Sequence, residues 1–246
     1  MLIIYSPFEW KSYTRRPHWL PASDYYQMLV IEPLLGICFI WLYPRRLLEF
    51  IKHRFKIRRG EKGILLFRPF SLGSYRTNYK MPFWAKIDRF LLGWQIRRLL
   101  KKLKYPQKMT ISCVNKVSQY YLIDLIKDSV KVYEVTDEYR VRTDQDSLKL
   151  HSSYSKKMEW MENRILMVAD IVFASSRALC DSKSKINPNT YYIPNAADFA
   201  HFSKSREPQT IVPRDILKKK RPRLGFIGNI NELLDIELLD LSLIHI

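Results

Sequence analysis

Cysteine is scarce in this sequence, with only three among 246 residues. Cys38, Cys113 and Cys180 lie far apart, without the paired spacing of a zinc site or the even number of a disulfide framework. No G-x-G-x-x-G follows the first apolar run, which disfavours an enzyme that binds a dinucleotide. These absences predict a reducing compartment and exclude the disulfide-stapled and zinc-finger classes.

A signal peptide and a long hydrophobic run are also missing. Residues 1–5 lack the basic start, the extended apolar stretch and the small-residue cleavage site of an export signal. The most hydrophobic window, 34–43, has about half of the roughly 20 residues that a membrane-spanning helix needs. We therefore expect no export and interpret this window as a buried segment.

Acidic residues are few beside basic ones, 24 against 42, so the formal net charge is +18. Such a charge attracts phosphate-bearing partners, and nucleic acid, nucleotide ligands and anionic lipid all remain open. Hydrophobic residues make up 47% and charged residues 27%, as in ordinary globular proteins. A chain of this length can bury one large core or two modest ones.

Short β-branched or aromatic runs alternate with longer helical patterns, which is typical of repeated βαβ units. Several runs are continuously apolar, as in a parallel sheet covered on both sides. The predicted fold class is α/β, a Rossmann-like, mainly parallel sheet with helices on both faces. The predicted strands span residues 2–6, 27–31, 63–67, 109–114, 130–135, 171–175 and 190–193.

Apolar residues at helical spacing predict one amphipathic helix over 83–103 and another over 158–168. Polar, turn-rich composition predicts loops over 73–82 and 140–153. The first helix carries many lysines and arginines beside its apolar stripe. Such a helix can lie on anionic lipid, or it can pack on the core and leave a solvated basic face.

The composition changes after the last predicted strand, and we expect four regions. Residues 1–202 form an N-terminal Rossmann-like domain, and the basic, proline-containing stretch 203–221 forms an interdomain linker. Residues 222–240 contain an apolar run, a glycine turn and a helical pattern, which together resemble the start of a second α/β domain. Residues 241–246 match the in-frame translation of a sequencing-library adapter and are expected to be non-native, with a natural leucine-rich helix end as the alternative.

Polar side chains follow several predicted strands. Glu9, Arg15 and Arg16 come after the first strand, Asp137 and Glu138 after the fifth, and Ser175 at the end of the sixth. Ligands of open parallel sheets bind outside the carboxyl ends of the strands. We therefore expect these side chains to gather at one edge of the sheet.

Four segments together resemble the GT-B glycosyltransferases, in particular bacterial family 4-like and family 1-like enzymes: residues 9–20, 132–139, 162–176 and 192–198. The resemblance covers residues 1 to about 240. It implies two facing Rossmann-like domains, of which the first receives the acceptor and the second holds a nucleotide-sugar. It also implies no metal, no cofactor besides the nucleotide-sugar co-substrate, and transfer with retained stereochemistry.

Asp137 and Glu138 are the candidate catalytic residues. One carboxylate would orient or deprotonate an acceptor hydroxyl and the other would hydrogen-bond a sugar, while helix capping is the alternative role of Asp137. Glu9, Arg15, Arg16 and Ser175 are candidate substrate-binding residues. The arginines would form bidentate bonds with phosphate, or they are solvated loop charges.

Asn195 and Asp198 are further substrate-binding candidates. The family usually has Asn-Gly-Val-Asp here, and Ala196 replaces the glycine, so the turn or its contribution to the cleft differs. An ordinary turn, in which both side chains bond nearby backbone, is the alternative. Gly228 and Asn229 would bind the donor phosphates. The D-x-D tripeptide at 144–146 is interpreted as a chance match rather than a metal site.

The expected function is transfer of a sugar from a nucleotide-sugar to a lipid-linked or saccharide acceptor in cell-envelope or exopolysaccharide synthesis. Because residues 1–5 lack an export signal, we expect a cytoplasmic enzyme, either free or peripheral at the inner face of the plasma membrane, where many enzymes that it resembles act on lipid-linked acceptors. Because most donor-binding groups belong to the second domain, we expect this chain alone to be inactive. The alternative is a basic nucleic-acid-binding α/β module without enzymatic activity; we expect no nucleic-acid partner, because the cations are scattered and no recognition motif occurs.

Overall fold

The computed structural model describes residues 1–6, 20–32, 35–36, 57–71, 82–138, 149–220, 223, 225–226 and 235–243. Contacts divide the chain into two units, Met1–Ala196 and Ala197–Ile246, and each is described by itself. The predicted boundary at 202 remains a prediction, although helix α8 (Phe199–Ser203) already belongs to the second unit.

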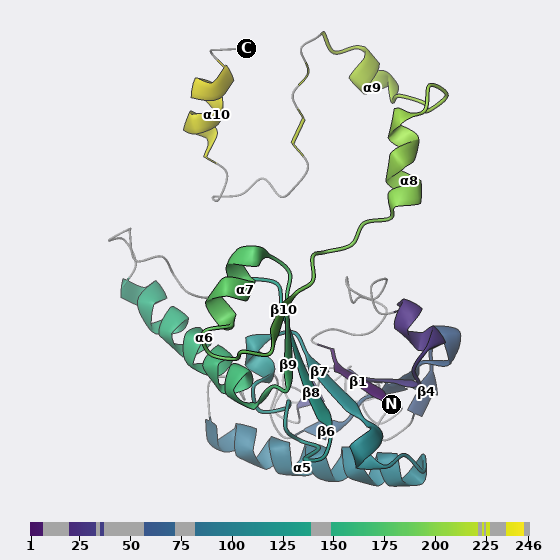
Figure 1. The fold of residues 1–246 in the computed structure, drawn as a ribbon, viewed down its shortest axis with the longest axis vertical. Coiled ribbons are helices and arrows are strands. Elements are labelled where there is room, and N and C mark those ends of the chain that lie inside the picture. The colour runs from purple at the N-terminus through teal and green to yellow at the C-terminus, as the bar shows by residue number, and fades with distance from the viewer. Residues whose placement is uncertain are drawn as a thin grey trace. The chain divides into compact units, whose positions relative to one another are not determined.

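The first unit is built on an eight-stranded sheet with the strand order β10-β9-β8-β7-β1-β2-β5-β4 (Figure 1). Every neighbouring pair is parallel except β4 and β5. The predicted α/β fold with a mainly parallel, Rossmann-like sheet is thus confirmed. The strands are β1 (Leu2–Tyr5), β2 (Met28–Ile31), β4 (Ile57–Arg59), β5 (Leu65–Phe67), β7 (Ile111–Val114), β8 (Val130–Val135), β9 (Ile171–Ala174) and β10 (Thr190–Tyr192).

All seven predicted strands are present, because apolar runs bounded by turns leave few alternatives to a buried strand. Three shorter strands were not predicted. β4 is partly exposed and contains two arginines, while β3 (Leu35–Gly36) and β6 (Phe70–Ser71) are two residues long and pair with each other. Neither length nor pattern distinguishes such short segments from loops.

The sheet is apolar on both faces. On one face Ile3 and Tyr5 share a core with helices α5 (Pro82–Lys102), α6 (Lys149–Val168) and α7 (Arg177–Lys183) (Figure 1). On the other face Leu2 and Ile4 belong to a second core, against which Ala22 of the 3-10 helix η2 (Leu20–Asp24) packs.

Helix α5 confirms the first predicted helix. Its first residue is Pro82, which suits a helix start because the missing N–H would be unpaired there anyway. The predicted loop over 73–82 otherwise lies outside the described residues. The predicted loop over 140–153 is wrong from residue 149 onward, where α6 begins. That stretch is polar but contains no glycine or proline, so nothing in it stops the helix from extending.

The second unit contains α8, α9 (Arg214–Leu217) and α10 (Ile236–Leu243). The described part of the predicted linker is almost entirely exposed and includes α9. Arg223, Gly225 and Phe226 have no regular secondary structure, and the rest of the apolar run and glycine turn at 223–230 lies outside the described residues. The helical pattern after that turn is confirmed by α10.

Within the described ranges, no helix combines the length and the apolar character needed to cross a membrane. The hydrophobic window at 34–43 falls outside the described residues apart from β3.

Candidate functional site at the carboxyl ends of β7, β8 and β9

The chain reverses its direction of travel through the sheet at β1. Strands β2 and β5 are added on one side of β1, and β7 to β10 are added on the other. In open parallel sheets, ligands bind in the crevice outside the carboxyl ends of the strands at such a switch point. The residues at this switch point are Ser6, which follows β1, and Asn115 and Lys116, which follow β7.

Gln119 fixes the backbone at this switch point. Its side chain is fully buried, and its Nε2 donates to the carbonyl oxygen of Tyr5 at the end of β1. Its Oε1 accepts from the backbone N–H groups of Asn115 (3.0 Å) and Lys116 (3.2 Å). One amide thus ties the turn after β7 to β1, so that Lys116 is carried on a fixed backbone.

Asp137 stands beside Lys116. The Lys116 Nζ lies 3.6 Å from Asp137 Oδ2, and the Asp137 carboxylate also accepts from Thr136 Oγ1 at 3.3 Å. The Asp137 side chain is 57% exposed and that of Lys116 is 38% exposed. Exposed ion pairs contribute little to stability, so the fold does not require this pair. Its groups remain open to a ligand.

Ser175 joins the same edge from the next strand. Its backbone N–H donates to the carbonyl of Val135 at 3.0 Å and its hydroxyl to the carbonyl of Thr136 at 3.5 Å. The structure therefore brings two sequence-predicted residues, Asp137 and Ser175, together with Lys116, which was not predicted. A carboxylate, a hydroxyl and an ammonium group at one sheet edge suit the binding of a polar, hydroxyl-bearing ligand.

Glu138 has a different setting. The Nζ of Lys183 in α7 lies 2.9 Å from Glu138 Oε1 and 2.8 Å from Glu162 Oε2. The Glu162 Oε1 accepts from the hydroxyl of Tyr133 at 3.2 Å. Lys183, Glu162 and Tyr133 are each about 1% exposed, whereas Glu138 is 40% exposed. This polar cluster joins β8, α6 and α7, and through Glu138 it reaches the residue next to Asp137.

Burial raises the pKa of Glu162, although the hydrogen bond and positive charge of Lys183 and the Tyr133 hydroxyl oppose the shift. The paired cation thus does not fully offset the loss of water around this carboxyl group. Glu138 is anchored by the same ammonium group, which holds the chain at the end of β8. Within the described contacts Glu138 acts as an anchor, and its direct role toward a sugar remains a prediction.

The other predicted site residues are not brought together here. Glu9, Arg15, Arg16, Gly228 and Asn229 lie outside the described residues, as does the tripeptide 144–146. Glu138, directly after Asp137, has no regular secondary structure, and residues 139–148 lie outside the described residues, so the capping alternative for Asp137 stays a prediction.

Asn195 follows β10 in an exposed segment without regular structure. Asp198 caps α8, since its Oδ1 accepts from the backbone N–H of His201 at 2.9 Å. This contact agrees with the turn-like alternative for Asp198, which belongs to the second unit.

Besides Lys116, sequence reasoning missed Lys183, Gln119 and Arg177. Lys183 lies four residues after the buried Leu179, a spacing that places both on the sheet-facing side of α7. A lysine at a helical position where an apolar residue is expected indicates a buried, paired charge, and this signal is present in the sequence. Arg177 lies with its guanidinium 5.2 Å from the ring of Tyr192 at the ends of β9 and β10, a contact that no local pattern indicates.

Comparison with models of known protein families finds no match. Comparison with curated proteins likewise finds no significant match.

Proposed function

We propose that this chain carries the acceptor-side domain of a GT-B-type glycosyltransferase. The full enzyme would transfer a sugar from a nucleotide-sugar to a hydroxyl of a lipid-linked or saccharide acceptor in cell-envelope or exopolysaccharide synthesis, in the cytoplasm, without a metal and with retained stereochemistry. The observation that carries the proposal is the exposed Asp137 carboxylate beside Lys116 at the end of β8, next to Ser175 and near the switch point. The resemblance of four segments to this family supports it.

In this proposal the acceptor hydroxyl donates a hydrogen bond to Asp137, which orients the hydroxyl or takes its proton as the new bond forms. The Ser175 hydroxyl would supply a second hydrogen bond to the acceptor. The leaving diphosphate would be stabilised by backbone N–H groups and cations of the second domain, including Gly228 and Asn229. Glu9, Arg15, Arg16 and Asn195 are proposed to complete the acceptor side.

The test is a screen of nucleotide-sugars with the protein translated from its whole gene, read as release of the nucleoside diphosphate in the presence of membrane-lipid extract. We expect release with one donor and no release by residues 1–246 alone, because the second domain would hold the diphosphate. Turnover by residues 1–246 would contradict this division of roles.

Binding of nucleic acid by a basic α/β module without enzymatic activity remains the competing function, because the formal net charge is +18. Tight, sequence-selective binding to nucleic acid without any transfer would favour it. Weak, salt-sensitive binding to generic DNA would show only the charge.

A further inference from the structure

Helix α5 has two contrasting sides. Its buried side packs on the sheet through Leu92, Ile96, Leu99 and Leu100. The opposite side, which we call the α5 outer face, is exposed and consists of Phe83, Lys86, Phe90, Trp94, Arg97, Arg98 and Lys101.

Three large aromatic side chains stand on the α5 outer face. Phe83 is 66% exposed, Phe90 is 69% exposed and Trp94 is 47% exposed. Their spacings of seven and four residues place them in one row along the helix. Helices of soluble proteins normally turn such residues inward, and an exposed row of them marks a contact surface.

Cations of α5 flank this row, while Asp124 and Asp128 of a neighbouring segment lie on one side of it, where they line a shallow hollow together with Phe90 and Lys86. The only acidic residue of α5, Asp88, is buried and accepts from the Ser71 hydroxyl at 2.6 Å. Arg89 at the rim is engaged by Asp124 at 2.6 Å, whereas Lys86 and Lys101 form no ion pair within the described part of the chain. The Arg98 guanidinium lies 5.4 Å from the ring centre of Trp94, so charge and aromatic surface are presented together.

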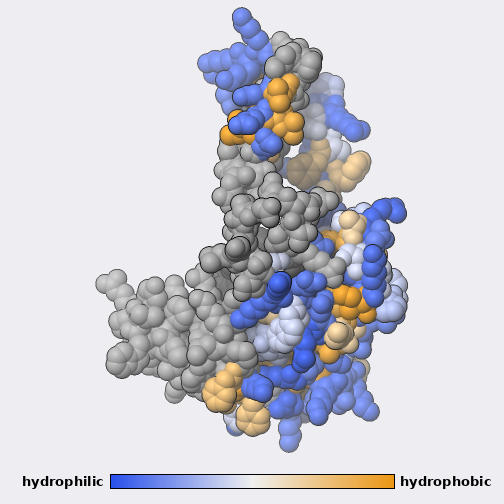
Figure 2. All heavy atoms as spheres, turned by 90° about the vertical axis from the view of Figure 1, so that its left-hand side faces the viewer, coloured by the Kyte–Doolittle hydropathy of each residue, from blue (hydrophilic) through white to orange (hydrophobic). Residues whose placement is uncertain are grey.

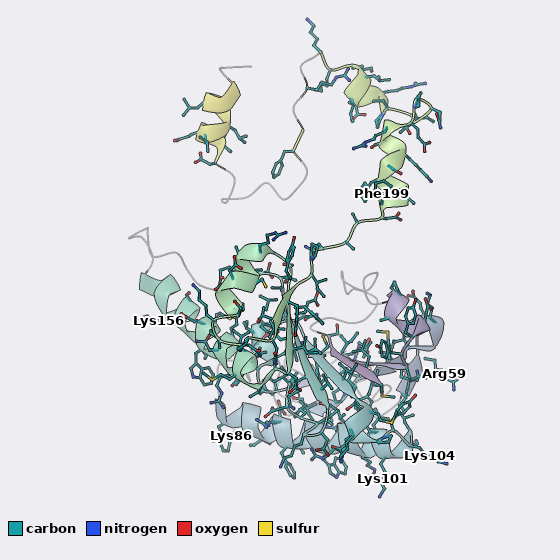
Figure 3. All side chains as sticks on the ribbon, in the orientation of Figure 1. Arg59, Lys86, Lys101, Lys104, Lys156 and Phe199 are labelled. Atoms are coloured by element: carbon teal, nitrogen blue, oxygen red, sulfur yellow. The ribbon has the colours of Figure 1, made fainter. Side chains whose placement is uncertain are left out.

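The exposed cations of the α5 outer face extend along the length of the helix. Figure 3 shows Lys86 near the start of α5, with Lys101 and Lys104 at its far end, on the outside of the first unit. From Lys86 to Lys101 the helix rises about 22 Å. Figure 2 shows hydrophobic and hydrophilic residues side by side at the lower end of this unit, where α5 lies in Figure 1.

We propose that the α5 outer face docks on an anionic membrane surface. The three rings would enter the boundary between headgroups and acyl chains, and the flanking cations would contact lipid phosphates. Proteins that bind single-stranded nucleic acid present their aromatics within a groove lined by cations. Here the hollow that Phe90 lines also contains the carboxylates of Asp124 and Asp128, and Phe83 and Phe90 are about two-thirds exposed, which favours insertion of the rings into lipid. The inference goes beyond the proposed transfer reaction and does not depend on it.

The test is co-sedimentation of residues 1–246 with vesicles of phosphatidylglycerol and phosphatidylcholine, compared with phosphatidylcholine alone. We expect binding to the anionic vesicles only. The combined variant Lys86→Gln/Arg98→Gln/Lys101→Gln should bind about 100-fold more weakly, and Phe83→Ser/Phe90→Ser at least tenfold more weakly. Unchanged thermal unfolding would show that both variants fold, since all five residues are exposed.

The matched control is Lys218→Gln/Lys219→Gln/Lys220→Gln, which removes the same three charges from the exposed second unit. We expect it to retain most of the binding. Equal losses in both triple variants, or no effect of the phenylalanine changes, would overturn the proposal, because net charge alone would then explain binding. Tighter binding to a single-stranded oligonucleotide that is weakened by Phe83→Ser/Phe90→Ser would overturn it in favour of nucleic acid.

Discussion

Lys183 and Glu162 are buried residues that support the candidate site from the interior of the protein. The buried ammonium group of Lys183 is stabilised by its two carboxylate partners. Removing one partner of a buried ion pair typically costs about 3–5 kcal/mol, because the remaining charge is left buried without compensation. Here the buried lysine connects α7 to α6 and to the chain just after Asp137. The cluster therefore holds the end of β8 in place.

The raised pKa of Glu162 makes stability depend on pH. The folded state holds this proton more tightly than the unfolded chain, so the free energy of unfolding decreases as the pH rises from the ordinary value of 4.5 through the higher folded-state pKa. Glu162→Gln removes this dependence. The free energy of unfolding of the wild type minus that of Glu162→Gln should therefore fall with rising pH in urea titrations.

Glu237→Gln, which removes one carboxylate from an exposed position of α10, is the control variant. A difference that instead grows with pH would mean that the attraction of Lys183 outweighs burial at Glu162.

At this scale the sequence predicted Asp137 and Ser175 at one edge, because both directly follow apolar strands. It did not predict that Glu138, the very next residue, would be held by Lys183. That contact joins residues 45 positions apart and depends on how α7 packs, which no local pattern determines.

Among the elements, helix α5 has one side that packs in the core and an opposite side that we propose to contact a membrane. Ile96 is fully buried in the main core, whereas Phe90 of the same helix is largely exposed. Ile96→Ala should lower the free energy of unfolding by about 2–5 kcal/mol, because it removes buried methyl groups and leaves a cavity. Phe90→Ala should change it by no more than about 0.5 kcal/mol.

Chemical denaturation of both variants measures these effects. A large loss of stability in Phe90→Ala would mean that this ring packs within the protein, and Phe90 would then not be available to contact a membrane.

The elements were also the most predictable level. Long apolar runs and helical periodicity predict the seven main strands and α5, whereas the polar residues at the start of α6 favour a loop, although they are helical from residue 149. The exposed aromatic row of α5 was not separated from its core stripe, since periodicity marks apolar positions without distinguishing buried from exposed ones.

For the whole molecule, the strand order places the switch point at β1, and the polar residues at the ends of β7, β8 and β9 lie beside it. The strand order was not predicted, because sequence patterns mark strands but not their neighbours. The position of the site therefore depends on the order of the strands in the sheet and not on one segment of the sequence. The central claim is that Asp137 at this edge serves sugar transfer to an acceptor.

The most direct measurement compares the sugar-transfer rate of Asp137→Asn with that of Asp128→Asn in the protein translated from the whole gene, which we propose to be the active glycosyltransferase. Asp128 is an exposed aspartate just before the opposite end of the same strand, β8. The account predicts a loss on the order of 100-fold or more for Asp137→Asn, little change for Asp128→Asn, and unaltered stability for both. A transfer rate of Asp137→Asn equal to that of the wild type would contradict it.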